Sequence, residues 1–183
     1  MATQTAATVE DVLRLADQGE RYELIDGELV EMAPTSFGHG DVELRIGRVF
    51  GDHVDRYQLG TVVVGEVLFL LDRAAGLARA ADVASVRRER LPLGRMVTGA
   101  FVGAPDVVVE IISPGNTANE IQQKIDQWLT HGTLAVLAVY PEQRSVVLWR
   151  ENGAVILRGD DELNLDPAMP GFRCKVSDLF PRP

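Results

Sequence analysis

The sequence contains one cysteine, Cys174, so no disulfide can form within the chain. A zinc site built on cysteines is excluded for the same reason. The three histidines, His39, His53 and His131, lie far apart and lack the spacing of a metal-binding motif. A chain without disulfides suits a reducing compartment, and we expect this protein in the cytoplasm.

Long apolar runs and positive charge are also scarce. No stretch approaches the ~20 apolar residues that a membrane span needs, and residues 1–12 carry neither the basic nor the apolar segment of a secretory signal. The net charge is −9. This argues against a general nucleic-acid binder, which should present a basic face. A net negative charge is still compatible with a local basic patch, or with an acidic site whose charge is neutralised by metal ions.

With 183 residues, 46% of them hydrophobic and 25% charged, the composition predicts one globular domain over residues 1–183. Strands cluster before one helix and resume after it, which predicts a mixed α/β fold with helices packed on a central sheet. Helices are expected at 8–17, at about 42–57 and at 117–131. Strands are expected at 21–32 as a hairpin that turns at Asp26-Gly27, and then at 61–71, 80–86, 106–112, 133–140, 145–150 and 154–158. Residues 87–103 are expected to form a loop, and residues 176–180 a short closing segment.

Glu110 is a charged residue among the apolar residues 107–112 of the predicted strand 106–112, a composition that is otherwise typical of a buried strand. Alternate side chains of a strand share a face, so Glu110 should point the same way as Asp106. Asp82 and Glu66 likewise interrupt apolar strands. Taken alone, each of these three carboxylates is best explained as a residue at a strand end, in a salt bridge or on an exposed edge. Together they suggest carboxylates that converge on a hard cation, since Mg²⁺ is held by one or two carboxylates plus water and phosphate oxygens.

Lys124 lies beside Ile121 and Trp128 at the edge of the apolar stripe of the helix 117–131. On spacing alone, the better explanation is a lysine whose stem covers the core while its ammonium reaches water. The helix begins only a few residues after the Glu110 strand, however. Its first turns must lie near the end of that strand, from where Lys124 can reach the carboxylates.

The segments "YELIDGELVEM", "RAADVASV", "GAPDVVVEIISPGNTANEIQQKIDQWLTHGT", "VYPEQRSVVLWR" and "PGFRCKVSDLF" together resemble the Uma family of restriction endonucleases, within the PD-(D/E)XK nuclease superfamily. The resemblance runs from about Tyr22 to Phe180 and is most specific from Pro105 to Gly132. It implies an αβββαβ core with a mixed central sheet flanked by helices, and a nuclease that uses Mg²⁺ or Mn²⁺ to hydrolyse DNA.

The resemblance also implies roles for individual residues. Asp82 and Glu110 match the two metal-binding acids of the superfamily. Ile112 stands where the superfamily places its lysine, and Lys124 matches the helix lysine that replaces it in this family. Two departures, Ala81 in place of proline and Trp128 in place of a more typical tyrosine, remove no catalytic side chain.

Further roles are less determined. Glu66 and Asp106 are candidates for one of two roles: to hydrogen-bond the groups that bind the metal, or to bind the metal themselves. Three arginines of the loop, Arg87, Arg88 and Arg90, either contact phosphate or simply belong to a solvated loop. We expect a homodimer, because twofold dimers are common and duplex cleavage needs two active sites. The alternative to an active nuclease is a nuclease fold that has become a binding or interaction module.

Overall fold

The computed structural model describes residues 6–92 and 97–181. The elements follow the chain as α1 (Val9–Asp17), β1 (Tyr22–Ile25), β2 (Glu28–Glu31), α2 (Phe37–Tyr57), β3 (Gly60–Asp72), β4 (Leu77–Arg87), η1 (Arg88–Arg90), β5 (Phe101–Val102), β6 (Val107–Ile111), α3 (Ala118–Thr130), β7 (Ala135–Tyr140), β8 (Ser145–Arg150), β9 (Gly153–Arg158), β10 (Glu162–Asn164), β11 (Arg173–Lys175) and η2 (Val176–Leu179).

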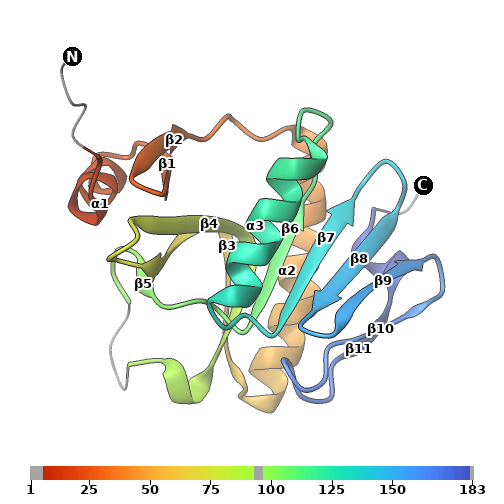
Figure 1. Cartoon of the computed structure of the whole chain (residues 1–183). Helices are drawn as coiled ribbons and strands as arrows, with labels where there is room; N and C mark the ends of the chain where they lie inside the picture. Colours follow the sequence, from red (N-terminus) through yellow and green to blue (C-terminus); the bar gives the residue numbers. More distant parts are fainter. Residues whose placement is uncertain (1–5, 93–96, 182–183) are drawn as a thin grey trace.

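In the described part of the chain, nine strands form one mixed sheet (Figure 1). Its main path runs β2-β1-β4-β6-β7-β8-β9, while β3 pairs with β4 and also carries β5. Neighbours on the main path are antiparallel except β6 and β7. A parallel pair needs a crossover connection, and α3 provides it between these two central strands.

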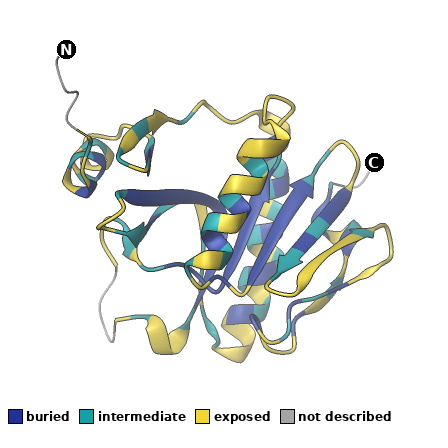
Figure 2. Ribbon diagram, in the orientation of Figure 1, coloured by how far each residue is buried: buried dark blue, intermediate teal, exposed yellow. Residues whose placement is uncertain are grey.

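Helices α2 and α3 cover opposite faces of the sheet (Figure 1). Side chains of β6 alternate between the two resulting cores, as the sequence predicts: Val107 and Val109 pack with α2, and Val108 packs with Trp128 of α3. Figure 2 shows β6 and β7 as buried strands and β9 as a largely exposed edge. The two candidate metal ligands, Asp82 of β4 and Glu110 of β6, therefore lie on buried strands of the sheet.

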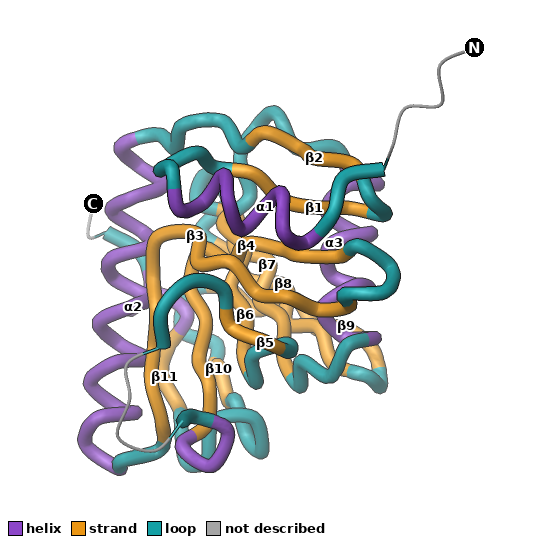
Figure 3. Tube along the Cα trace, turned by 90° about the vertical axis from the view of Figure 1, so that its left-hand side faces the viewer, coloured by secondary structure: helices purple, strands orange, loops and turns teal. Residues whose placement is uncertain are grey.

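Local sequence signals account for the ends of several elements. Capping boxes begin α1, where Thr8 and Asp11 bond reciprocally, and α3, where Thr117 and Glu120 do the same. The hairpin of β1 and β2 turns through Asp26 and Gly27, both with positive φ (51° and 78°), which matches a type I′ turn. Figure 3 shows α1 lying beside this hairpin, and Val9 and Val12 of α1 pack with Leu24 of β1.

The structure corrects some predicted boundaries. β4 is longer than the predicted strand 80–86 and is buried along almost its whole length. Asp106 precedes β6 instead of belonging to it. Tyr57 is not part of the apolar stripe of α2, because 58% of it is exposed.

Short elements account for the other differences. β10 and β11 were not predicted, since three residues are too few to show alternation. The predicted loop 87–103 contains η1 and β5, and its residues 93–96 lie outside the described part. None of the described helices is both long and apolar enough to cross a membrane.

Candidate active site

Asp82 and Glu110 lie where the two central strands β4 and β6 separate. The antiparallel register pairs Val83 with Val109, so Asp82 and Glu110 follow one residue further along. There the Ile111 N–H donates to Asp82 Oδ2 at 2.6 Å. Beyond this point β4 pairs with β1 through Ala78 and Leu24. The divergence of the strands opens the sheet at the two carboxylates.

On its other side, β4 faces a bulge in β3. The register steps from Val64–Val83 to Val67–Ala81, so Gly65 and Glu66 both lie opposite Asp82. Both bulge residues have positive φ, 91° and 54°. β-Bulges are common next to active sites, where they re-aim side chains. Here the bulge lets Gly65 N–H donate to Glu43 of α2, while Glu66 pairs with Arg21.

Glu110 is 6% exposed, and two side chains of α3 bind its carboxylate. Trp128 Nε1–H donates to its Oε1 at 2.7 Å, and Lys124 Nζ lies 2.9 Å from its Oε2. Burial raises the pKa of Glu110 to about 7; the Lys124 ammonium opposes this shift and the charge of Asp82 adds to it. This carboxyl therefore exchanges its proton near neutral pH.

Lys124 connects two carboxylates. Its Nζ lies 3.2 Å from Glu23 Oε1 as well as 2.9 Å from Glu110. Burial acts to lower the pKa of Lys124, but the charges of Glu110, Glu23 and Asp82 outweigh it and raise that pKa. The prediction that this ammonium meets a site carboxylate is confirmed. The alternative, a lysine that reaches only for water, is wrong, because the neighbouring carboxylates hold the ammonium.

The sequence did not reveal the pair of Glu23 and Arg79, which completes this side of the site. Arg79 Nη1 lies 2.7 Å from Glu23 Oε2, and Ala80 N–H donates to Glu23 Oε1 at 2.9 Å. Burial acts to raise the pKa of Glu23, but Lys124, Arg79 and these hydrogen bonds lower it. Like Asp82, Glu23 is a charged residue between apolar neighbours in a strand, but β1 has only four residues, too few for this signal to separate a buried acid from an exposed one.

Helix α2 adds His39 and Glu43, which the sequence also did not reveal. His39 Nε2 lies 3.4 Å from Asp82 Oδ1. Burial acts to lower the pKa of His39, but contact with Asp82 and the charges of Glu43 and Glu110 raise it. Burial and the charge of Asp82 raise the pKa of Glu43. The two residues are four apart and flank Val42 of the apolar stripe, a spacing that puts both on one side of the helix.

The donor set suits a hard cation. Within residues 6–92 and 97–181, no three His, Cys, Asp or Glu side chains form a ready metal-binding group. Asp82 and Glu110 supply two carboxylates, which matches how Mg²⁺ is held, with waters and substrate phosphate completing its shell. Burial and the nearby charge of Asp82 both disfavour an ionised Glu110, and a cation between the two carboxylates would offset this.

Asp106 and the three arginines lie away from this cluster. Asp106 is four residues before Glu110, roughly 13 Å along the strand. It accepts from Arg87 N–H at 2.8 Å and pairs with Arg90 at 3.1 Å; Arg88 donates to Gln58. The structure thus brings together Asp82, Glu110 and Lys124, and places Glu66 on the neighbouring bulge. The assigned roles of all these residues stay predictions.

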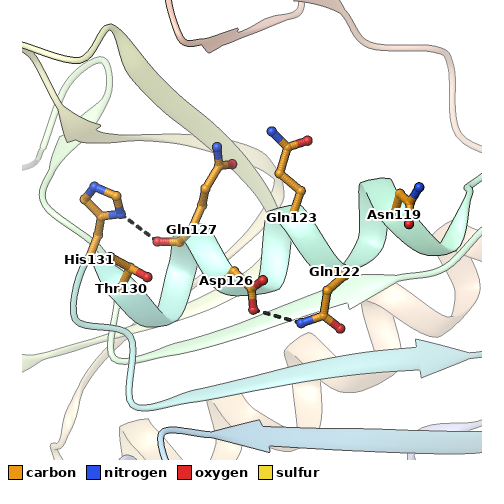
Figure 4. A pocket seen from close by; sticks show the side chains of 7 residues that line it. All are labelled: Asn119, Gln122, Gln123, Asp126, Gln127, Thr130 and His131. Carbon is orange, nitrogen blue, oxygen red and sulfur yellow. Dashed lines mark hydrogen bonds between the residues drawn. The ribbon is translucent and has the colours of Figure 1, made fainter.

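The solvent side of α3 carries a shallow pocket of about 520 Å³ (Figure 4). Asn119, Gln122, Gln123, Asp126, Gln127, Thr130 and His131 line it. None of them is a catalytic candidate. Gln127 connects this surface to the site, since its Oε1 accepts from Arg79 Nε at 2.6 Å.

Comparison with known proteins identifies the family and the fold. Residues 9–177 match the family model Uma2, described as "Putative restriction endonuclease". A solved structure from Anabaena variabilis, described as a "putative nuclease belonging to DUF820", superposes with a TM-score of 0.82 at 18% identity, covering 94% of this chain and 96% of that one. The likeness confirms the predicted α/β fold. No curated protein sequence matches the chain. Since the family model spans nearly all of the sequence, the chain belongs to the Uma2 family of nuclease-type proteins.

Proposed function

We propose that this protein is a Mg²⁺- or Mn²⁺-dependent DNA endonuclease whose active site consists of Asp82, Glu110 and Lys124. The observation that carries the proposal is the meeting of two buried carboxylates, at the separation of β4 and β6, with an ammonium 2.9 Å from one of them. The family and the fold support the reaction class, since nucleases of this type generally use divalent metals.

In this proposal Asp82 and Glu110 hold the metal. A divalent cation held there would offset the negative charge of the scissile phosphate and lower the pKa of a bound water. Asp82 is oriented by the Ile111 N–H. Glu110 is oriented by the Trp128 Nε1–H. Fixed ligand geometry of this kind is what a small cation such as Mg²⁺ demands.

Lys124 supplies a positive side chain that stays protonated in this acidic surrounding. Such a group stabilises the negative charge that builds up on the phosphate in the transition state. Ile112, at the position of the superfamily lysine, cannot do this. Glu23 and Arg79 act as positioning residues, because Glu23 holds the ammonium and Arg79 holds Glu23.

The test is a cleavage assay on single-stranded, duplex and branched DNA with Mg²⁺ or Mn²⁺, comparing the wild type with Lys124→Ala. Loss of one preorganised electrostatic group typically lowers kcat by about 10²–10³, and we expect at least that. The variant should stay folded, because alanine favours helix and Glu110 can take up a proton.

Metal binding is tested separately by thermal denaturation. Mg²⁺ or Mn²⁺ should raise the midpoint of the wild type and of Lys124→Ala, but not of Asp82→Ala or Glu110→Gln. A metal-dependent rise with no cleavage of any DNA would favour the alternative, a nuclease fold that binds without cutting. Full cleavage by Lys124→Ala would remove that residue from the mechanism.

A homodimer remains part of the proposal, since cutting both strands of a duplex needs two sites. The solution mass of the protein with and without duplex DNA tests it.

A further inference from the structure

A second pocket adjoins the carboxylate cluster, and the proposed function does not use it. It has a volume of about 410 Å³ and lies between the first turn of α2, the segment after β6 and the turn after β7. His39 and Ile111 line it, and both also contact Asp82. Whatever fills this pocket therefore lies directly beside the catalytic centre.

The pocket has one wall suited to an anion. Its lining includes Ser36 and Gly38 at the start of α2, a helix of 21 residues. Ser36 caps the His39 N–H at 3.2 Å, and no acidic residue occupies the first turn. The positive end of the helix dipole and the remaining N–H groups favour a phosphate there. Gly38 keeps this approach open, since a Cβ at that position would meet no protein atom within 4 Å.

His39 gives independent evidence for a ligand. It is only 7% exposed and lines the pocket. Its Nε2 lies 3.4 Å from Asp82 Oδ1, whereas its Nδ1 has no hydrogen-bond partner in the described part of the chain. A buried polar group without a partner is rare in a folded protein and calls for an explanation. A ligand oxygen in the pocket would provide the missing partner.

An exposed aromatic residue lies in the chain between two of the lining residues. Phe37 lies between Ser36 and Gly38 and is 94% exposed. The rest of the pocket wall is mostly apolar, with Ile111, Ile112 and Tyr140. Glu142, on the turn after β7, is the carboxylate among the described lining residues. Proteins that bind single strands combine a site for the backbone phosphates with aromatic rings on which bases stack.

We propose that this pocket binds a nucleotide of an unpaired DNA strand next to the scissile phosphate, with its phosphate at the N-terminus of α2 and its base on Phe37. The inference rests on the proposed nuclease function and narrows its substrate. A paired base is stacked inside the duplex and is not available to the ring. DNA with unpaired strands is therefore the preferred substrate, as single strands or as single-stranded branches.

The experiment measures binding and cleavage separately. Binding of a short fluorescent single strand, and of the blunt duplex of the same sequence, is followed by anisotropy with Ca²⁺ in place of Mg²⁺. Gel analysis afterwards confirms that the DNA is intact. Phe37→Ala should weaken binding of the single strand by about 5- to 150-fold, the range for loss of one base–aromatic stack. Its binding to the blunt duplex should be unchanged.

Two matched controls make the test specific. Tyr57→Ala removes another exposed aromatic at the far end of the same helix and should have no effect. Gly38→Ala should weaken binding of the single strand, whereas Gly40→Ala should not; neither Cβ meets a protein atom within 4 Å, and only Gly38 lines the pocket. Both changes favour helix, so neither variant should melt earlier than the wild type.

The outcomes separate the two proposals. Equal effects of Phe37→Ala and Tyr57→Ala, or an equal loss on single strand and duplex, would overturn the nucleotide site even if the enzyme cuts DNA. If the wild type cuts no DNA form with Mg²⁺ or Mn²⁺, the nuclease proposal fails. Binding of the single strand that depends on Phe37 and Gly38 would then still support the site.

Discussion

The two ends of β6 each bury a carboxylate beside basic side chains, yet they are built differently. At the amino end, Asp106 is 4% exposed and meets Arg87 and Arg90. Those two guanidinium groups also donate to backbone carbonyls, of Ala168, Pro167 and Ala104. At the carboxyl end, Glu110 is 6% exposed and meets one ammonium, which Glu23 shares.

The difference lies in the balance of charge. Around Asp106, two cations and an N–H surround one carboxylate, so the acid is satisfied and ties β6 to the segments around it. Around Glu110, burial raises the pKa to about 7, and the charges of Asp82 and Glu23 add to the rise that the Lys124 ammonium opposes. A buried acid is therefore a poor guide to a metal site by itself. An excess of buried acids over cations is a better one.

The largest expected effect comes from Asp106→Ala. Removing one partner of a buried ion pair typically destabilises a protein by about 3–5 kcal/mol, and this change leaves two arginines without their carboxylate. Chemical denaturation should therefore show a clear loss in the free energy of unfolding. The rise in melting midpoint caused by Mn²⁺ should persist, because Asp106 lies outside the carboxylate cluster.

Asp82→Ala is the counterpart at the other end. It should abolish the Mn²⁺-dependent rise while changing the stability of the metal-free protein less than Asp106→Ala does, since it relieves crowding of negative charge. If Asp106→Ala also abolished the metal response, the two ends would not differ as described.

The next effect concerns pH. A folded-state pKa of about 7 for Glu110, above the ordinary 4.5, means that the folded protein holds this proton more tightly than the unfolded chain. The stabilisation from Glu110 is therefore full below about pH 4.5 and is lost as the pH rises through about 7. Metal binding has the opposite dependence, because the cation needs the ionised carboxylate.

Affinity for Mn²⁺, measured by calorimetry, should thus fall about tenfold per pH unit below about pH 7, as one proton competes with the metal. In Glu110→Gln the affinity should be low and should lose this slope. A wild-type affinity that stays constant between pH 7 and pH 5 would contradict the raised pKa.

The features that the sequence predicts are those whose signal lies within a short stretch of the chain. Capping boxes, the Asp26–Gly27 turn and the alternation in β6 are local signals that can be read from neighbouring residues, and the structure contains all of them. Asp82, Glu110 and Lys124 were found because charges stand out in long apolar segments and because they match a family pattern. The inference that Asp106 and Glu110 share a face assumed that both lie in the strand, whereas Asp106 precedes β6. It also carried no information about distance or about the arginines near Asp106.

The missed residues needed tertiary information. Glu23 lies in a strand of four residues that is brought to the site by pairing with β4. His39 lies in the first turn of α2. The predicted helix begins only at about residue 42, because the glycines around His39 disfavour helix. The bulge opposite Asp82 depends on positive φ at Glu66, which a non-glycine residue rarely adopts. No pattern along the chain predicts such contacts, because the opening of the sheet determines them.

The smallest expected effect tests the hydrogen bond of Trp128. Trp128→Phe removes the Nε1–H that donates to Glu110 Oε1 at 2.7 Å but keeps an aromatic ring against Phe69. A hydrogen bond to a charged group contributes about 1.5–3 kcal/mol, and its loss disfavours the ionised form of Glu110. The midpoint of the pH dependence of Mn²⁺ binding should therefore move upward by about one to two units, at ~1.4 kcal/mol per unit. Trp149→Phe is the matched control, since Trp149 packs on the same core and has no such bond with Glu110 among the described residues. Equal midpoints in the two tryptophan variants would show that Trp128 contributes packing alone, whereas a shift confined to Trp128→Phe would show that α3 adjusts the acidity of the carboxylate it covers.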